Sequence, residues 1–160
     1  YGTTTEQSKA VQGRMREAAE NAGVSLDYEG GDPEPTGMMW NTFAAHKLLT
    51  WAGEEHGPQR QTALKLALFR AHFNHRRALG DDAVLLDIAE EEGFDRTAAR
   101  AALASEELAH KVRAEERAAW DLNITGVPAM VVENKFMIPG AQPAEAYADA
   151  LRRVAEKTAA

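Results

Sequence analysis

The segment NITGVPAMVVENKFMIPGAQP, residues 123–143, breaks the helical pattern that fills the rest of the chain. Residues 129–132 and 136–138 are short runs of strand-forming residues, and the polar residues 133–135 between them predict a hairpin turn. Pro128 can open the first strand, because proline is tolerated at the first residue of a strand. The segment therefore predicts a strand, a turn and a second strand.

A last helix follows the hairpin. Pro143 suits the first turn of a helix, and Tyr147, Leu151 and Val154 recur on one face of it. Two strands and one helix are an incomplete α/β unit, because a lone hairpin is at best marginally stable in water. We expect the strand at 129–132 to expose an unpaired edge, which a second copy of the chain could cover.

The chain before residue 123 reads as helix. Apolar residues recur at helical spacing, and capping residues and glycines mark the ends. The predicted helices run over 4–23, 41–57, 59–77, 82–92, from Asp95 onward, and 105–122.

The helix at 59–77 is predicted to be central, because Leu66 and Phe69 widen its apolar stripe until it nearly surrounds the helix. We also expect Trp40, Trp51 and Trp120 to pack in a core or a cleft.

Residues 29–37 hold three glycines, two prolines and three acidic residues, the strongest loop signal in the chain. We therefore predict an N-terminal helix and connecting segment at 1–37, a helical domain at 38–122 and an α/β part at 123–160.

Composition excludes several classes of function. The chain has 160 residues, a formal charge of −7 and no cysteine. The net charge argues against nucleic-acid binding, because neutralising phosphates requires a basic surface. A segment at 84–103 superficially resembles a helix-turn-helix, but its second helix offers only Arg96 and Arg100 as basic contacts. No apolar run approaches the roughly 20 residues of a membrane span.

The missing cysteines exclude a disulfide, a thiolate metal site and a cysteine nucleophile within these residues. His72 and His75 are spaced for metal binding, but no acidic residue completes the pattern of a zinc motif. We predict no metal and no cofactor.

Several segments together resemble one family. The stretch ITGVPAMVV…KFMIPGAQP is similar to the cis-proline loop and hairpin of DsbA-like proteins in the thioredoxin superfamily, the branch that includes FrnE-type dithiol oxidoreductases and 2-hydroxychromene-2-carboxylate isomerases. Further resemblance lies, in the family's order, in YGTTTEQSKAVQGRM (1–15), NTFAAHKLLTWA (41–52), ALFRAHF (67–73) and VLLDIAEEEGFD (84–95).

The resemblance implies an α/β fold: the C-terminal part of a thioredoxin-like domain with a large all-helical insertion. Family members begin with a strand and a loop that carries Cys-x-x-Cys, or a serine in the isomerases, and this chain has neither part. We therefore expect a C-terminal fragment of a thiol–disulfide oxidoreductase. The alternatives are a glutathione-dependent isomerase or transferase and a non-catalytic helical binding module.

The resemblance also implies site residues. Gly126, Val127 and Pro128 would form a platform for an extended substrate, or they simply open an edge strand. Asn41, Thr42 and His46 match the family's N-T…A-H pattern. They would line the substrate cleft, or they are a helix cap and a hydrogen-bonded histidine.

We expect a disulfide- or thiol-containing substrate, no nucleic acid, no membrane and a cytoplasmic location. Glutathione would be the cofactor only under the isomerase alternative. A homodimer is the expected way to cover the open strand edge.

Overall fold

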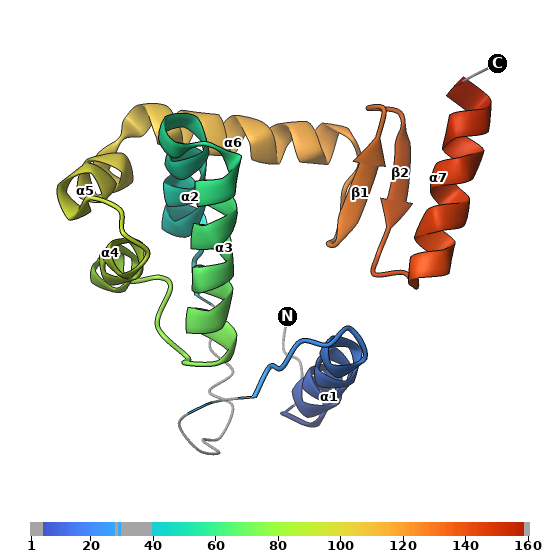
Figure 1. Cartoon of the computed structure of the whole chain (residues 1–160), viewed down its shortest axis with the longest axis horizontal. Helices are drawn as coiled ribbons and strands as arrows, with labels where there is room; N and C mark the ends of the chain where they lie inside the picture. Colours follow the sequence, from blue (N-terminus) through green and yellow to red (C-terminus); the bar gives the residue numbers. More distant parts are fainter. Residues whose placement is uncertain (1–4, 28, 30–39, 159–160) are drawn as a thin grey trace. The chain divides into compact units, whose positions relative to one another are not determined.

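The computed structural model describes residues 5–27, 29 and 40–158. Its elements are α1 (Thr5–Asn21), α2 (Phe43–His56), α3 (Pro58–Phe73), α4 (Asp82–Glu91), α5 (Arg96–Ala104), α6 (Glu106–Asp121), β1 (Ala129–Val132), β2 (Phe136–Pro139) and α7 (Ala144–Thr158) (Figure 1). By its internal contacts the chain divides into two compact units, Tyr1–Val112 and Arg113–Ala160. The boundaries proposed from the sequence at 37 and 122 stay a prediction.

The core of the first unit is built from the apolar faces of α2 to α5 and the start of α6. Its fully buried large side chains are Leu48, Leu64, Leu85, Leu86 and Ile88. Trp51 and Phe94 join the same cluster, with ring centroids 5.4 Å apart. These residues recur at helical spacing, so burying them together fixes how the helices pack.

Polar side chains accept hydrogen bonds from free backbone N–H groups at the starts of α2, α4 and α5. Asp81 accepts a hydrogen bond from Ala83 N at the start of α4, and Asp95 accepts one from Ala98 N at the start of α5. At α2 the side chain of Asn41 accepts from Phe43 N at 2.9 Å. Thr42 occupies the capping position itself but makes no side-chain cap bond. Asn41, and not Thr42, therefore satisfies the first free N–H of α2.

Lys47 is buried on α2 and donates from Nζ to the backbone oxygen of Leu103 at 2.5 Å. Leu103 lies in the last turn of α5, where unpaired carbonyl groups favour a cation. Lys47 therefore ties α2 to the end of α5 from inside the unit.

An exposed ion pair ties α6 to α2. Lys111 Nζ lies 2.9 Å from Glu54 Oε2 and 3.0 Å from Glu107 Oε1. The hydrogen bonds with Glu54 and then Glu107 raise the pKa of Lys111. Because the raised pKa belongs to the folded state, this stabilisation is full below the ordinary lysine pKa and is lost as pH rises through the raised value.

Asn74 joins α3 to the segment that follows α1. Its side-chain amide donates to the backbone oxygens of Ser25 and Asp27 at 3.2 and 2.9 Å, and its own carbonyl accepts from Glu29 N at 3.0 Å. The predicted helix at 59–77 ends earlier than expected, at Phe73, because Asn74 takes this role and Arg76 adopts a left-handed φ of 51°.

The second unit contains the predicted hairpin. β1 and β2 pair antiparallel, with Val132 opposite Phe136 and Ala129 opposite Pro139. Glu133 and Asn134 both have positive φ, and Lys135 N donates to Val132 O at 3.1 Å, which closes a tight turn between the strands. α7 lies beside β2 in Figure 1.

The prediction of a nearly encircled central helix is wrong for α3. Leu64, Ala67, Leu68 and Ala71 are buried, but Leu66 is 49% and Phe69 is 52% exposed. The prediction that Trp120 packs in a core or a cleft is also wrong, since Trp120 is 66% exposed near the end of α6. Trp51 is buried and Trp40 packs partly buried against the core, as expected.

The difference in burial between Leu85 on α4 and Leu66 on α3 can be measured by truncating each side chain to alanine. Leu85→Ala should lower the free energy of unfolding by about 3 kcal/mol, because it leaves a cavity in the core. Leu66→Ala removes the same atoms from an exposed position and should cost less than about 1 kcal/mol. Urea denaturation of both variants checks this; equal losses would contradict the assigned core.

The cap of α2 gives a second stability prediction. Asn41→Ala should destabilise the first unit by about 1 kcal/mol, because it leaves Phe43 N without its acceptor. Thr42→Ala should change stability by less than about 0.5 kcal/mol, since its side chain makes no cap bond. Thermal unfolding of the two variants decides between the two residues; a larger loss for Thr42→Ala would contradict the assignment.

Candidate functional site

The loop before β1 presents its backbone to solvent. Val127 is 90% exposed, and the Val127–Pro128 peptide bond is cis. Pro128 O accepts a hydrogen bond from Gly140 N at 2.8 Å, which joins the start of β1 to the end of β2. The residue that the sequence nominates as the substrate platform is therefore fully accessible.

β1 has one open edge within the described residues. The sheet has the order β1-β2, so the backbone groups on the other edge of β1 pair with no described strand. An extended peptide can add to such an edge through main-chain hydrogen bonds. Val127 stands directly before this edge.

Gly126 borders open space. A Cβ added to it would meet no atom within 4 Å, and its φ is not in the left-handed region. Neither conformation nor crowding in this chain requires glycine here. Its predicted role, which is to let a substrate approach closely, stays a prediction.

Asn41, Thr42 and His46 lie together at the start of α2, in the first unit. The Asn41 side chain is engaged in the helix cap, and Thr42 O accepts from His46 N at 3.0 Å. The imidazole of His46 is exposed. Gly126, Val127 and Pro128 belong to the second unit.

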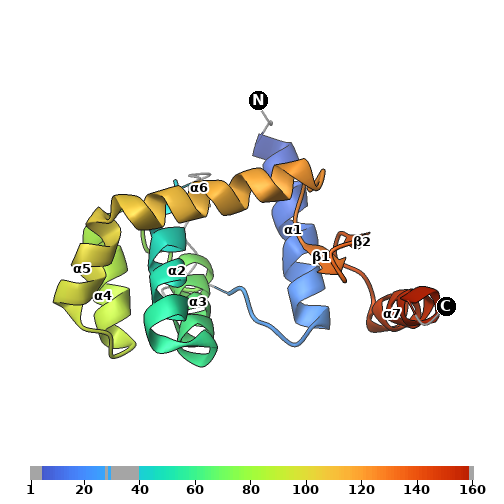
Figure 2. The same ribbon diagram turned by 90° about the horizontal axis from the view of Figure 1, so that it is seen from above.

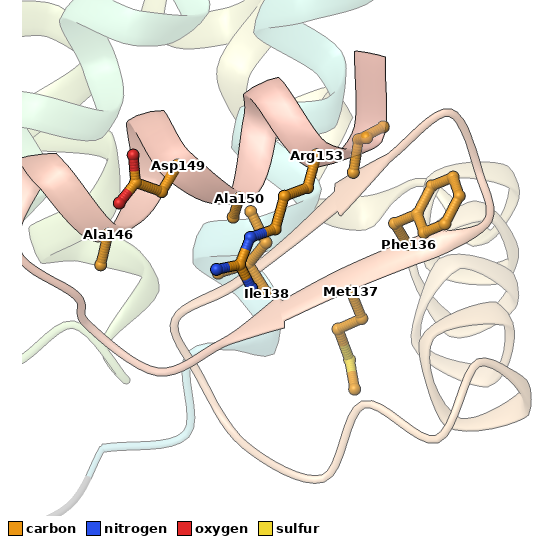
Figure 3. Close-up of a pocket in the computed structure, with 8 residues that line it drawn as sticks. Phe136, Met137, Ile138, Ala146, Asp149, Ala150 and Arg153 are labelled. Carbon is orange, nitrogen blue, oxygen red and sulfur yellow. The ribbon is translucent and has the colours of Figure 1, made fainter. Parts of the chain in front are cut away.

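The second unit also holds a groove of about 410 Å³ between β2 and α7 (Figure 3). Figure 3 shows the Arg153 side chain reaching from α7 toward Ile138, with Phe136 on the strand beyond. The lining is mostly apolar: Phe136, Met137, Ile138, Ala146, Asp149, Ala150, Arg153 and Val154. The groove contains none of the residues predicted for the site.

Both faces of the hairpin are apolar. Strand alternation puts Val131 and Met137, which are directly opposite each other, on the face of the hairpin away from Phe136 and Ile138, although Met137 also contributes to the lining of the groove. Val131 and Met137 are each more than a third exposed. Strands that are apolar on both faces are typical of sheets covered on both sides.

The two spaced histidines do not form a joint site. The ring of His72 contacts Phe73, with centroids 4.7 Å apart, while His75 Nδ1 lies 3.6 Å from Glu29 Oε2. Among the residues that the structure describes, no group of three or more histidine and acidic side chains is placed to hold a metal ion. The same part of the chain contains no helix long and apolar enough to cross a membrane.

The sequence analysis did not identify the residues that hold the end of the hairpin in place, next to the loop at Val127. Tyr147 donates from its hydroxyl to Gly140 O at 3.0 Å, and Gln142 Nε2 donates to Pro139 O at 2.9 Å. These bonds tie the start of α7 to the end of the hairpin. In the sequence, the stretch Gly140-Ala141-Gln142 belonged to the family resemblance, but it did not indicate these hydrogen bonds.

Comparisons with known proteins identify the family and the fold. The family model of the DSBA-like thioredoxin domain matches residues 2–152. A search of the curated proteins finds no match.

Solved structures with a similar fold include a probable DsbA oxidoreductase from Streptomyces coelicolor. It is 35% identical, with a TM-score of 0.79, and the match covers 96% of this chain and 62% of that one. The chain thus spans less than two thirds of this relative's length.

Two more distant structures share the fold. A putative protein disulfide isomerase from Nitrosomonas europaea is 18% identical, with a TM-score of 0.74 and coverage of 97% of this chain and 76% of that one. The cytosolic disulfide reductase DsbM from Pseudomonas aeruginosa, solved with GSH, is 20% identical, with a TM-score of 0.57 and coverage of 75% and 63%.

The family model spans nearly the whole chain. The helices and the hairpin of the chain follow the order that the resemblance implied. The protein therefore belongs to the DsbA-like thioredoxin family, with an α/β fold that carries a large helical insertion.

Proposed function

We propose that this chain is the substrate-binding part of a FrnE-type thiol–disulfide oxidoreductase. The observation that carries the proposal is the full exposure of Val127 directly before the open edge of β1. Family membership supplies the reaction class. A cytoplasmic location remains part of the proposal.

The chemistry requires a thiolate, and these 160 residues contain no cysteine. We place the thiolate elsewhere in the whole protein. It would attack one sulfur of a substrate disulfide, form a mixed disulfide and release the other sulfur as a thiolate. The chain described here would hold the substrate backbone during this exchange, and alone it should have no redox activity.

Backbone recognition suits a substrate of variable sequence. An extended segment pairing with the backbone at Val127 and along β1 would be bound through groups that every residue possesses. Gly126 leaves open space beside this position, and Pro128 fixes the start of the strand. Asn41, Thr42 and His46 stay proposed substrate-binding residues, and the ring of His46 is exposed.

The same open edge favours a homodimer of the isolated chain. Pairing between two copies of β1 would satisfy the free backbone groups and cover Val131. This contact would compete with peptide binding at the edge.

The cysteine-free sequence makes the platform directly testable. Val127→Cys should form a mixed disulfide with an extended, disulfide-containing peptide about tenfold faster than Glu145→Cys, because bound substrate raises the local concentration of the disulfide. Both residues are exposed. Rates are measured by mass spectrometry and normalised to the reaction of each thiol with a small aromatic disulfide, which removes differences in intrinsic reactivity.

Equal normalised rates would contradict the platform. Glutathione disulfide serves as the second probe: an acceleration with it alone, and none with the peptide, would instead favour the glutathione-dependent alternative.

Self-association gives a separate prediction. A lysine on an edge strand opposes strand pairing, so Val131→Lys should shift the chain from dimer to monomer in sedimentation velocity. Leu151→Lys places the same charge at an exposed position on α7 and should leave the dimer intact. A wild-type chain that is already monomeric would contradict the dimer.

A further inference from the structure

Pro128 leaves one backbone acceptor of the hairpin without its usual donor. The register of the two strands pairs Ala129 with Pro139, and continued by one residue it places Pro128 opposite Gly140. The hydrogen bond from Gly140 N to Pro128 O at 2.8 Å shows that this pair is formed. Such a pair in an antiparallel ladder normally exchanges two N–H···O bonds, but proline has no N–H for the second one. The carbonyl of Gly140 therefore needs another donor.

The hydroxyl of Tyr147 is that donor. It lies 3.0 Å from Gly140 O and reaches it from the first turn of α7. Figures 1 and 2 show the short connection that leads from the end of β2 into this turn. Within the connection, Gln142 Nε2 donates to Pro139 O at 2.9 Å. Side chains of the connection and of α7 thus hold the end of β2 at the point where the ladder lacks a bond.

Hydrogen bonds, and not packing, fix the place of Gly140. The residue has no side chain to pack, and its φ of 72° turns the chain out of β2. A Cβ placed on it would meet one atom of the described residues within 4 Å, Gln142 Nε2 at 3.8 Å, so its surroundings do not confine it. Its N–H, bonded to Pro128, and its carbonyl, bonded to Tyr147, are the groups that hold it.

The loop at Val127 is anchored at two points. The N–H of Ile124 is bonded to the last turn of α6, and Pro128 O accepts from Gly140 N. Between these points, residues 125–127 make no backbone hydrogen bond to any part of the chain that the structure describes. The Val127 side chain is 90% exposed, so packing does not hold it either. The orientation of the Val127 backbone therefore depends on how firmly the two anchors are held.

We propose that Tyr147 is a positioning residue for the loop at Val127. Its hydroxyl fixes Gly140, whose N–H fixes Pro128, and Pro128 in turn orients the backbone of the residue before it. A backbone that is already oriented binds an extended segment more tightly, because less conformational freedom is lost on binding. Tyr147 acts through the hairpin and needs no contact with the substrate.

The part of this bond in substrate binding rests on the proposed function, but the orientation of the loop does not. Two variants isolate the hydroxyl. Tyr147→Phe removes it and keeps the ring. Thr158→Val is the matched control, because it removes a hydroxyl from the same helix, one that bonds within α7 to Val154 O at 3.0 Å.

Amide hydrogen exchange, followed by NMR on the full chain, tests the orientation of the loop. Tyr147→Phe should raise the exchange rate of Gly140 N–H at least about threefold, because loss of the hydroxyl frees Gly140 to leave its partner. The exchange rate of Ile138 N–H, which lies inside the hairpin, should stay within about twofold of wild type. The backbone order parameter of Val127 should fall in the same variant. Thr158→Val should change none of these values.

Disulfide exchange then tests the part in binding. In the Val127→Cys background, Tyr147→Phe should slow mixed-disulfide formation with the extended peptide at least about threefold, because the loop must then be ordered on binding. The rate with the small aromatic disulfide should not change, since that probe does not pair with the backbone. Thr158→Val should alter neither rate.

An unchanged exchange rate at Gly140 in Tyr147→Phe would overturn the proposal. Equal rises at Gly140 and Ile138 would overturn it too, since the hydroxyl would then only stabilise the hairpin as a whole. So would a faster exchange at Gly140 with an unchanged peptide rate. If the Val127→Cys thiol shows no preference for the peptide with Tyr147 intact, the proposed function fails, and the exchange rates at Gly140 still decide whether Tyr147 orients the loop.

Discussion

Mutual burial of short helices is the constraint on which the first unit depends. α4 has 10 residues and α5 has 9, and isolated helices of this length are marginal in water. They persist because Leu85, Leu86 and Ile88 of α4 and Ala99 and Ala102 of α5 are buried in the common core that these helices form with α2 and α3. Away from this core, His46 on α2 and Leu66 and Phe69 on α3 are exposed. The exposure of His46 and Phe69 is therefore a consequence of where the core lies.

The second unit is held in a different way. Its strands are apolar, but among the side chains that the structure describes in this unit only Val154 on α7 is buried. At one end, the hydrogen bond from Gly140 N to Pro128 O joins the two strands, and the bond from the Tyr147 hydroxyl to Gly140 O joins the hairpin to α7. A hairpin needs further cover to be stable, so whatever pairs with β1 would also steady the loop at Val127. Stability and binding thus depend on the same edge.

The sequence predicted the order of the elements well, because helical periodicity and the change to strand-forming residues are local signals. It placed the hairpin turn and the ends of α4 correctly for the same reason. It failed on Leu66 and Phe69, since an apolar residue does not reveal whether a neighbour covers it. Asn74 and Lys47 bond to residues far away in sequence, and no local pattern marks such contacts.

The candidate site was predictable in part. Val127 and Pro128 followed from a resemblance carried by several segments, and their exposure agrees with a binding role. The choice of Asn41 over Thr42 as the cap depends on backbone angles that the sequence does not state. The register between α2 and α3 rests on the hydrogen bond from Gln61 Nε2 to Leu49 O, and no local pattern in the sequence marks that contact. Backbone pairing at β1 would use groups that every residue possesses, so the proposed site at Val127 would accept substrates of many sequences.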